Sequence, residues 1–310
     1  MDLTILFVSI ASMGGIGLAL AAILAVADKK LAVKEDPRVE QAIEALPGAN
    51  CGSCGYAGCS AFARALVEGK VEPAACKPGG QEVSDRLRDI LGLEGGGEQV
   101  PLRARVFCSG GDGETVKDKR YTGVPTCESA NLVGGEKACM YSCLGYGDCA
   151  QACPFDAIHM NENRLPVIDL GKCTGCGVCV EACPRNIIHL TEPDEAVHVY
   201  CSSTDKGPAT KKICSAGCIA CRLCEKDDDT GAVKVVDNLA RIDYAVSKAP
   251  VKATRRCPTK VIRLAEPVPG HEYRLPEGAL EQQETTACGA GRVHRRRERC
   301  RRRRSRADRP

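Results

Sequence analysis

The sequence has few of the large aromatic side chains that most domains use to build their cores. Its 310 residues include no Trp, 4 Phe and 7 Tyr. Because aromatic side chains supply much of the buried area of an ordinary core, large aromatic cores are excluded. Small modules of this composition can instead be held together by bound metal, since the free energy of metal binding then stabilises the fold.

Signatures of substrate-converting enzymes are also missing. The chain contains no dinucleotide-binding glycine fingerprint, no phosphate-binding P-loop and no nucleophile elbow around a serine. We therefore expect no catalytic residues and no substrate-converting pocket in this chain.

Cysteine, in contrast, is abundant, with 22 residues. Chains rich in cysteine are either disulfide scaffolds, which are usually short and secreted, or metal proteins. Most of these cysteines fall in Cys-x2-Cys and Cys-x3-Cys-Pro runs, which bring several thiolates to one point. Such spacing is natural for a metal cluster and difficult to satisfy with disulfides.

Residues 3–27 form one uncharged, apolar segment that is long enough to cross a bilayer as a helix. Lys29 and Lys30 follow at once and no Lys or Arg precedes it, so the positive-inside rule places the N-terminus outside and the rest in the cytoplasm. A cleaved signal peptide is the alternative, because Ala25-Val26-Ala27 resembles a cleavage site, but the basic opening segment is missing. We predict a single-pass anchor at 1–28 in the inner membrane.

Residues 36–92 are predicted to form a small α-helical Fe–S module. Apolar residues recur at helical spacing over 38–46 and 60–68. Glycines between the nearby cysteines let the backbone curl round an inorganic core. A four-cysteine zinc site is the alternative, but x2-then-x4 spacing is not its usual pattern. The predicted ligands of this cluster 1 are Cys51, Cys54, Cys59 and Cys76.

The clearest signal lies in residues 100–200, where two cysteine runs each end in Cys-Pro. The run from Cys173 to Cys183 has the Cys-x2-Cys-x2-Cys-x3-Cys-Pro spacing of bacterial ferredoxins, and the run from Cys139 to Cys153 is a looser version. In two-cluster ferredoxins the fourth cysteine of each run binds the other cluster. The predicted ligands are Cys139, Cys143, Cys149 and Cys183 for cluster 2, and Cys153, Cys173, Cys176 and Cys179 for cluster 3.

Short strands are expected beside these two cysteine runs. Together with the runs they would form an α+β ferredoxin-like domain. Residues 157–160 and 166–169 predict a hairpin, and residues 187–190 a matching strand. His159 and His189 occupy equivalent positions in these strands. We expect both to be exposed strand residues rather than ligands, since the cysteines already suffice.

A degenerate ferredoxin-like repeat is predicted at residues 201–266. The spacing rule places Asp228, Ser247, Pro250 and Ala253 at four positions where a complete repeat has cysteine. All four positions belong to one cluster under the crossed rule, which predicts that this repeat has lost one cluster and kept the other. The predicted ligands of the retained cluster 4 are Cys218, Cys221, Cys224 and Cys257.

Six cysteines remain outside these sets. Cys288 and Cys300 lie near the C-terminus. The other four border the two-cluster module, and they are either free buried thiols or the ligands of one further site. This extra site would consist of Cys108, Cys127, Cys201 and Cys214. Four [4Fe–4S] clusters are thus expected, or five if the extra site binds one.

Residues 267–310 are predicted to form a disordered basic tail. From Cys288 to Pro310 the chain has 11 Arg against two acidic residues, a net charge of +9. Runs of like charge are usually disordered, and near a membrane they can bind anionic lipid. Aromatic residues for stacking on bases are absent from the Arg-rich part, so no nucleic-acid partner is expected.

Three parts of the chain together resemble the B subunit of the Rnf ion-translocating oxidoreductase complex, in its long form with extra ferredoxin repeats. They are the apolar anchor and the segments Ala45-Leu-Pro-Gly-Ala-Asn-Cys-Gly-Ser-Cys-Gly-Tyr-Ala-Gly-Cys59 and Tyr141-Ser-Cys-Leu-Gly-Tyr-Gly-Asp-Cys-Ala-Gln-Ala-Cys-Pro-Phe-Asp-Ala-Ile158. The resemblance implies a cytoplasmic electron-entry subunit that takes electrons from reduced ferredoxin. It passes them to membrane partners and on to NAD, coupled to sodium or proton movement.

Two alternative functions remain open from the sequence. One is a polyferredoxin-type subunit of another membrane redox complex, and the other is a zinc-binding scaffold without redox activity. Colour tests the zinc scaffold, because iron–sulfur protein is brown whereas zinc protein is colourless. The identity of co-purifying multi-span membrane partners would distinguish the other redox complex from an ion-translocating one.

Overall fold

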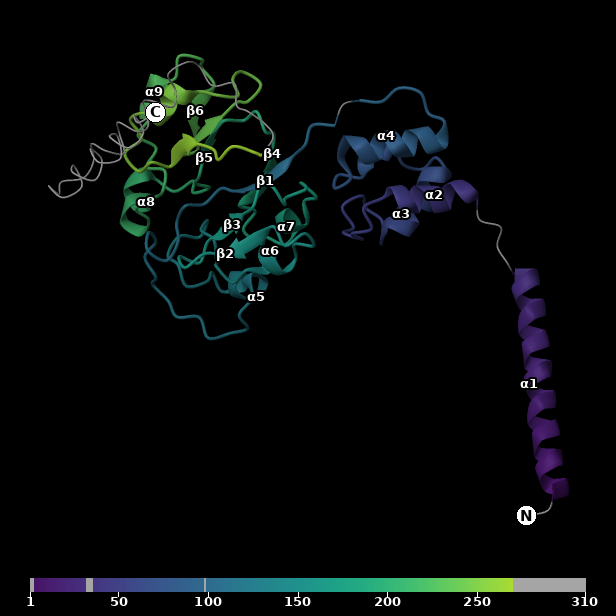
Figure 1. Ribbon diagram of the computed structural model, residues 1–310. Helices are drawn as coiled ribbons and strands as arrows, with labels where there is room; N and C mark the ends of the chain where they lie inside the picture. Colours follow the sequence, from purple (N-terminus) through teal and green to yellow (C-terminus); the bar gives the residue numbers. More distant parts are fainter. Residues whose placement is uncertain (1–2, 32–35, 98, 270–310) are drawn as a thin grey trace, which may run out of the picture.

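The computed structural model describes residues 3–31, 36–97 and 99–269 (Figure 1). The predicted disordered tail, with Cys288 and Cys300, lies outside these residues except for its first three positions.

A single apolar helix, α1 (Leu3–Leu31), opens the chain and stands apart from everything else (Figure 1). Its window Ile10–Ala27 has a mean hydropathy of 2.2, and none of that window is buried. At about 1.5 Å per residue, the helix is long enough to cross a bilayer. The predicted N-terminal apolar helix is therefore confirmed by length and composition.

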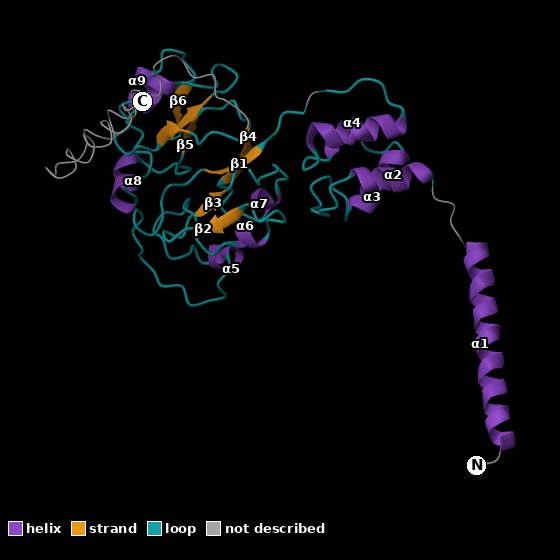
Figure 2. Ribbon diagram, viewed as in Figure 1, coloured by secondary structure: helices purple, strands orange, loops and turns teal. Residues whose placement is uncertain are grey.

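The first cysteine module is built from helices. It contains no strand among its described residues, and its helices pack around one small core (Figure 2). Asp36 caps the first helix by accepting a hydrogen bond from the Arg38 amide, and Gly92 ends the last one in a left-handed conformation. The elements are α2 (Pro37–Ala45), α3 (Cys59–Val67), the 3-10 helix η1 (Pro73–Ala75) and α4 (Gly80–Leu91). The helices predicted at 38–46 and 60–68 correspond to α2 and α3.

The next unit has the βαββαβ order of a two-cluster ferredoxin, with one additional short helix after its first strand. Its outer strands pair antiparallel with each other, β1 with β4, and its inner strands form the hairpin of β2 and β3. The strands are β1 (Arg103–Val106), β2 (Ile158–Met160), β3 (Pro166–Ile168) and β4 (Ile188–Thr191), and the helices are α5 (Cys127–Leu132), α6 (Asp148–Gln151) and α7 (Val178–Glu181). The predicted hairpin is confirmed, and His159 and His189 are both exposed.

The degenerate repeat folds into a second unit with the same strand pairing. Its outer strands β5 and β8 pair antiparallel, as do its inner strands β6 and β7. The elements are β5 (Val197–Val199), α8 (Gly207–Ile213), α9 (Leu223–Asp227), β6 (Val233–Val236), β7 (Leu239–Ile242), η2 (Val251–Thr254) and β8 (Ile262–Leu264). The ferredoxin framework is therefore complete here even though half of its usual ligand positions are occupied by other residues.

Two insertions, one after the first strand of each unit, are joined through their backbones. The Val116 amide donates to the Ile213 carbonyl at 2.8 Å, and the Ser215 amide donates to the Glu114 carbonyl at 2.9 Å. On its other side, the Val116 carbonyl accepts from the Ala138 amide at 2.8 Å. Because these bonds satisfy backbone groups from both insertions, they fix the two units against each other.

We predict that Gly207→Ala destabilises the second unit. Gly207 opens α8, and a Cβ atom there would lie 2.1 Å from the Ile219 carbonyl oxygen. The carbonyl belongs to the loop between Cys218 and Cys221, so it can move only by disturbing that loop. We expect the free energy of unfolding to fall by about 1–3 kcal/mol, seen by calorimetry as a lower unfolding temperature.

Gly97→Ala is the matched control for this substitution. No atom lies within 4 Å of the Cβ position at Gly97, so the same change should have little effect there. Equal unfolding temperatures for the Gly207→Ala and Gly97→Ala variants would contradict the steric argument.

Candidate iron–sulfur centres

The four cysteines predicted in the first module line one cavity, together with Phe62 and Asn50. Asn50 shapes the loop between α2 and α3, because its side-chain oxygen accepts from the Cys59 amide at 2.8 Å and its amide donates to the Gly48 carbonyl at 3.1 Å. Burial raises the pKa of Cys76, and the three neighbouring thiols add to the effect. We call this set group 1: Cys51, Cys54, Cys59 and Cys76.

The cysteines predicted for cluster 3 also lie together, in the first ferredoxin unit. Burial raises the pKa of Cys179 to about 12, and the charges of the other three thiols contribute. Two backbone amides point at sulfur atoms, from Ala104 to Cys173 at 3.5 Å and from Ala157 to Cys153 at 3.4 Å. We call this set group 3: Cys153, Cys173, Cys176 and Cys179.

The cavity that contains three of the residues predicted for cluster 2 differs from the sequence prediction at one position. Cys127 takes the place that spacing assigned to Cys139. The cause is Asp148 in α6, whose carboxylate accepts from the amides of Cys127 at 2.9 Å and Glu128 at 3.2 Å. These bonds hold the start of α5 beside α6. We call this set group 2: Cys127, Cys143, Cys149 and Cys183.

The cysteines predicted for cluster 4 are brought together in the second ferredoxin unit. Burial raises the pKa of Cys224 to about 11, and Cys218, Cys221 and Cys257 add to the shift. Among the described cysteines, Cys221 alone is exposed. We call this set group 4: Cys218, Cys221, Cys224 and Cys257.

The four non-cysteine positions of the second unit have structural roles. Asp228 accepts from the Thr230 hydroxyl and from the Val233 amide, both at 2.7 Å, and so fixes the turn before β6. Ser247 accepts from the Ala249 amide at 3.4 Å. Pro250 and Ala253 are fully buried, and Ala253 is part of an apolar core.

A further cavity collects the displaced Cys139 with three of the cysteines left over from the sequence analysis. The extra site expected from the sequence contained Cys127 in this place, so the structure exchanges Cys127 and Cys139 between two sets. Burial raises the pKa of Cys201 to about 12 and that of Cys139 to about 11. We call this set group 5: Cys108, Cys139, Cys201 and Cys214.

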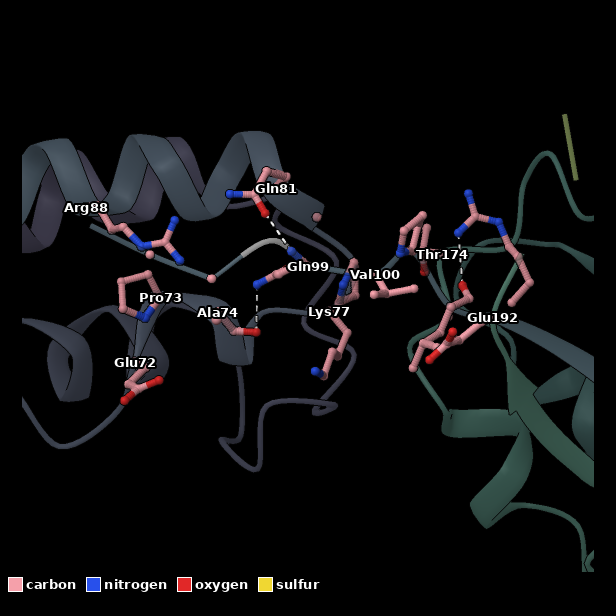
Figure 3. Close-up of a pocket in the computed structure, with 18 of the residues that line it drawn as sticks. Glu72, Pro73, Ala74, Lys77, Gln81, Arg88, Gln99, Val100, Thr174 and Glu192 are labelled. Atoms are coloured by element: carbon pink, nitrogen blue, oxygen red, sulfur yellow. Dashed lines mark hydrogen bonds between the residues drawn. The ribbon is translucent and has the colours of Figure 1, made fainter. Parts of the chain in front are cut away.

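Cysteines of group 1 approach those of group 3 across the junction between the first module and the first ferredoxin unit. Cys51 is near enough to Cys176 for its charge to raise the pKa of Cys176, in addition to the effect of burial. A groove along this junction is lined by Lys77, Thr174 and Glu192 from both sides (Figure 3). The connecting chain is held in it by Gln99, which bonds to Gln81 and to the Ala74 carbonyl.

The all-sulfur donor sets fit iron–sulfur clusters. Within the described ranges, no three His, Cys, Asp or Glu side chains are arranged around a single metal ion. The cysteines instead surround cavities, and thiolates around a larger core are the ligands of [4Fe–4S] clusters. Burial raises the pKa of several of these thiols, so binding of a metal core, which takes the thiolate form, would be coupled to release of their protons.

The fold and these cysteine groups define an iron–sulfur protein with ferredoxin-like units and an apolar N-terminal helix. Family models agree, since one for an Fe-S cluster matches residues 46–78 and one for a 4Fe-4S binding domain matches residues 166–189. More specifically, the chain belongs to the family of B subunits of the ion-translocating oxidoreductase (Rnf) complex. The resemblance seen in the sequence is confirmed, and the chain is an electron-transfer protein.

Relatives from three organisms carry this assignment. The chain is 41% identical over 264 residues to the B subunit of the ion-translocating oxidoreductase complex of Methanosarcina acetivorans, covering 84% of this chain and 99% of that protein. It is 40% identical over 252 residues to the B subunit of the proton-translocating ferredoxin:NAD(+) oxidoreductase complex of Clostridium ljungdahlii (80% and 88% covered). It is 38% identical over 261 residues to the B subunit of the Na(+)-translocating ferredoxin:NAD(+) oxidoreductase complex of Acetobacterium woodii (84% and 78% covered).

We predict that Asp228 stabilises the second unit without binding metal. Asp228→Ala should leave the iron content unchanged and lower the free energy of unfolding by about 1–3 kcal/mol, because the Val233 amide loses its acceptor. Asp228→Asn keeps an oxygen acceptor and should cost less. Iron analysis and calorimetry check both, and loss of iron from Asp228→Asn would show that the carboxylate is a ligand.

Proposed function

We propose that this chain relays electrons inside an ion-translocating ferredoxin:NAD oxidoreductase complex, from reduced ferredoxin toward membrane partners and NAD. The observation that carries the proposal is the arrangement of the cysteine groups, which approach one another from unit to unit while the chain itself begins with an apolar helix. The ferredoxin:NAD activity named for the relatives from Clostridium ljungdahlii and Acetobacterium woodii supports the choice of donor and final acceptor.

The ligand sets proposed for four [4Fe–4S] clusters are groups 1 to 4. Three of these sets are those predicted from the sequence, whereas group 2 includes Cys127 in place of Cys139. When bound, such clusters supply one-electron redox chemistry over a wide range of potentials, which their surroundings set.

The protein's own contribution is to keep these sets buried, close together and supplied with amide donors. Backbone N–H groups directed at cysteine sulfur, as at Cys173 and Cys153, stabilise negative charge on the ligands and tune the potential. Cys149 of group 2 is near enough to Cys179 of group 3 for their charges to interact. Short separations matter because the rate of electron tunnelling falls steeply with distance.

The exposed Cys221 makes the second ferredoxin unit the proposed docking place for reduced ferredoxin. Its group is the most accessible to a soluble donor, because every other described cysteine is at least partly buried. The first module follows directly after α1 along the chain, so we propose that group 1 delivers electrons to the membrane partners. We further propose that α1 crosses the inner membrane with its N-terminus outside and that residues 36–269 face the cytoplasm.

The domain boundaries proposed for this relay follow the cysteine groups. They are the anchor at 1–28, the four-cysteine module at 36–92, the two-cluster unit at 100–200, the second ferredoxin unit at 201–266 and the basic tail at 267–310.

Metal analysis of the anaerobically purified full chain tests the cofactors. Four clusters predict at least about 16 irons per chain, with matching acid-labile sulfide and little zinc. Stoichiometric zinc with little iron would instead support the zinc-binding scaffold and overturn the electron relay.

The direction of electron flow is tested with Cys51→Ala in the assembled complex. We expect reduced ferredoxin still to bleach the visible absorption of the ferredoxin units, while delivery of electrons to the membrane partners falls at least tenfold. The measurement is reduction of NAD by membrane vesicles, with Cys288→Ala as the cysteine control. Undiminished NAD reduction by Cys51→Ala would show that group 1 is not the last site before the membrane.

A further inference from the structure

We propose that group 5 binds a fifth [4Fe–4S] cluster, located between the two ferredoxin units. The inference rests on the proposed function, and it assigns a site that the ferredoxin spacing rule does not provide. Its ligands would be Cys108, Cys139, Cys201 and Cys214.

The cavity around these cysteines offers sulfur and no competing ionic ligand. Its other lining residues are Gly, Ala, Ser, Thr and Tyr, without any carboxylate or histidine. Cys139 and Cys214 are buried, and Cys108 and Cys201 are partly so. Four cysteine sulfurs around one buried cavity are the donor set of [4Fe–4S] clusters.

The two ferredoxin units contribute to the cavity in an equivalent way. Cys108 lies two residues after the end of β1, and Cys201 lies two residues after the end of β5, the corresponding strand of the second unit. Each unit then adds one cysteine from its insertion, Cys139 in one case and Cys214 in the other. The convergence of four cysteines from two related units in this equivalent way is not expected of unrelated free thiols.

Backbone pairing between the insertions positions Cys139 and Cys214 beside the cavity. Thr115 forms an antiparallel bridge with Cys214, and Lys117 forms one with Lys137, two residues before Cys139. The same segment, 115–117, thus aligns both cysteines from its two sides. This pairing also draws Cys139 away from group 2, where the sequence spacing had assigned it.

Hydrogen-bond donors surround the sulfur atoms as they do in group 3. Cys201 accepts from the amides of Ser203 at 3.4 Å and Cys218 at 3.3 Å. Cys214 accepts from the Thr115 hydroxyl at 3.6 Å. Such donors stabilise thiolates that are bound to metal and are of little use to buried neutral thiols.

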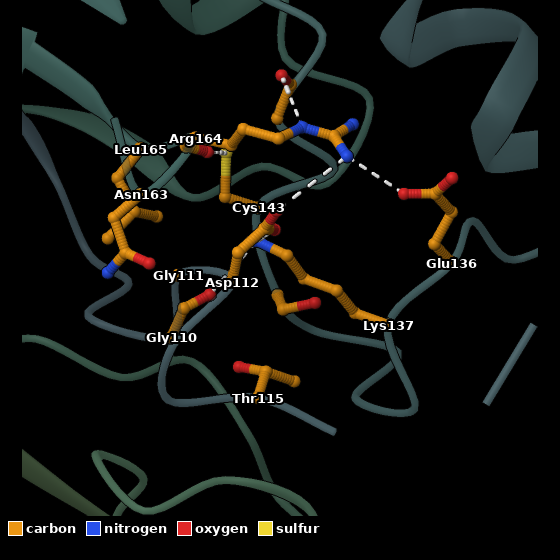
Figure 4. Close-up of polar contacts among 12 residues, drawn as sticks. Gly110, Gly111, Asp112, Thr115, Glu136, Lys137, Cys143, Asn163, Arg164 and Leu165 are labelled. Atoms are coloured by element: carbon orange, nitrogen blue, oxygen red, sulfur yellow. Dashed lines mark hydrogen bonds and ion pairs between the residues drawn. The ribbon is translucent and has the colours of Figure 1, made fainter. Parts of the chain in front are cut away.

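A buried lysine next to the cavity supplies positive charge. Lys137 is 4% exposed, donates to the Gly110 carbonyl at 3.2 Å and pairs with Asp112 at 3.6 Å (Figure 4). Burying an ammonium group is costly, and a cluster with four thiolates has the net negative charge that would offset this cost.

Group 5 also fills the space between groups 2 and 4. The Cys143 amide of group 2 donates to the Cys108 sulfur at 3.4 Å, and the Cys218 amide of group 4 donates to the Cys201 sulfur at 3.3 Å. With a cluster in group 5, the order 4, 5, 2, 3, 1 becomes an unbroken series of neighbouring sites. Electrons from the second ferredoxin unit could then reach the first through group 5, whose ligands accept hydrogen bonds from cysteine amides of groups 2 and 4.

Iron and acid-labile sulfide in the anaerobic full chain give the first test. Five clusters predict about 20 irons per chain, and Cys214→Ala should contain about 16 with the same fractional loss of sulfide. Cys288→Ala, outside every proposed site, should keep the full count. A wild-type count of about 16 that Cys214→Ala leaves unchanged would overturn the fifth cluster while leaving the proposed function intact.

Double variants test which cysteines share a site. Cys139→Ala with Cys214→Ala should lose only the four or so irons that each single variant loses, because both substitutions remove the same cluster. Cys127→Ala with Cys214→Ala should lose about eight, because two clusters are removed. The reverse pattern would overturn our grouping in favour of the sequence-based one.

The remaining iron in each variant serves as the folding control. Retention of about 16 irons in Cys214→Ala shows that the other groups are still assembled. One zinc per chain beside about 16 irons would show a mononuclear site in group 5 and overturn the proposal. Little iron in the wild type would instead reject the proposed function as a whole.

Discussion

Coordination of buried thiolates is the constraint on which the rest of this structure depends. The apolar clusters of all three folded units include cysteine side chains, so several of the proposed ligands are also part of the core. Burial raises the pKa of Cys143, Cys149 and Cys179 to about 12, which makes thiolates unfavourable without a bound cation. The free energy of metal binding therefore contributes directly to folding, and it replaces the aromatic packing that the chain lacks.

A comparison of the two ferredoxin units shows that the same strand framework forms when one set of cysteine ligands is missing. Both have the same strand pairing, yet the second has Pro250 and Ala253 where a complete repeat would have ligands. These residues are buried beside Val251 and Ile262, so apolar packing occupies the region of the missing ligand set. Asp228, at the fourth position, has become a turn residue. A ferredoxin fold can thus keep its β-sheets when one half of its sulfur ligands is replaced by apolar side chains.

The two insertions join the ferredoxin units to each other. Each follows the first strand of its ferredoxin unit, and the two are paired with each other through Val116, Ile213 and Ser215. They carry cysteines to the boundary between the units, where neither repeat alone has a complete set. An electron relay needs short steps more than it needs any particular fold, and the paired insertions bring cysteines of both units to their shared boundary.

Local spacing by itself determined the helices α2 and α3, the hairpin of β2 and β3, and the composition of groups 1, 3 and 4. Their ligands come mostly from tight loops, in which two or four intervening residues bring successive thiolates to one point. The apolar helix α1 was equally plain from its length and from the absence of charge over residues 3–27.

Only the tertiary structure placed Cys127 beside Cys143 and Cys149, because the spacing of the run had assigned Cys139 to that set. Asp148 binds the amide of Cys127 from 21 residues away, and the pairing of 115–117 with 137 and 214 holds Cys139 elsewhere. The pairing of β1 with β4 was likewise hidden, since its partners are far apart in the chain. Contacts between distant segments leave no periodic trace in a sequence, whereas ligands within one loop do.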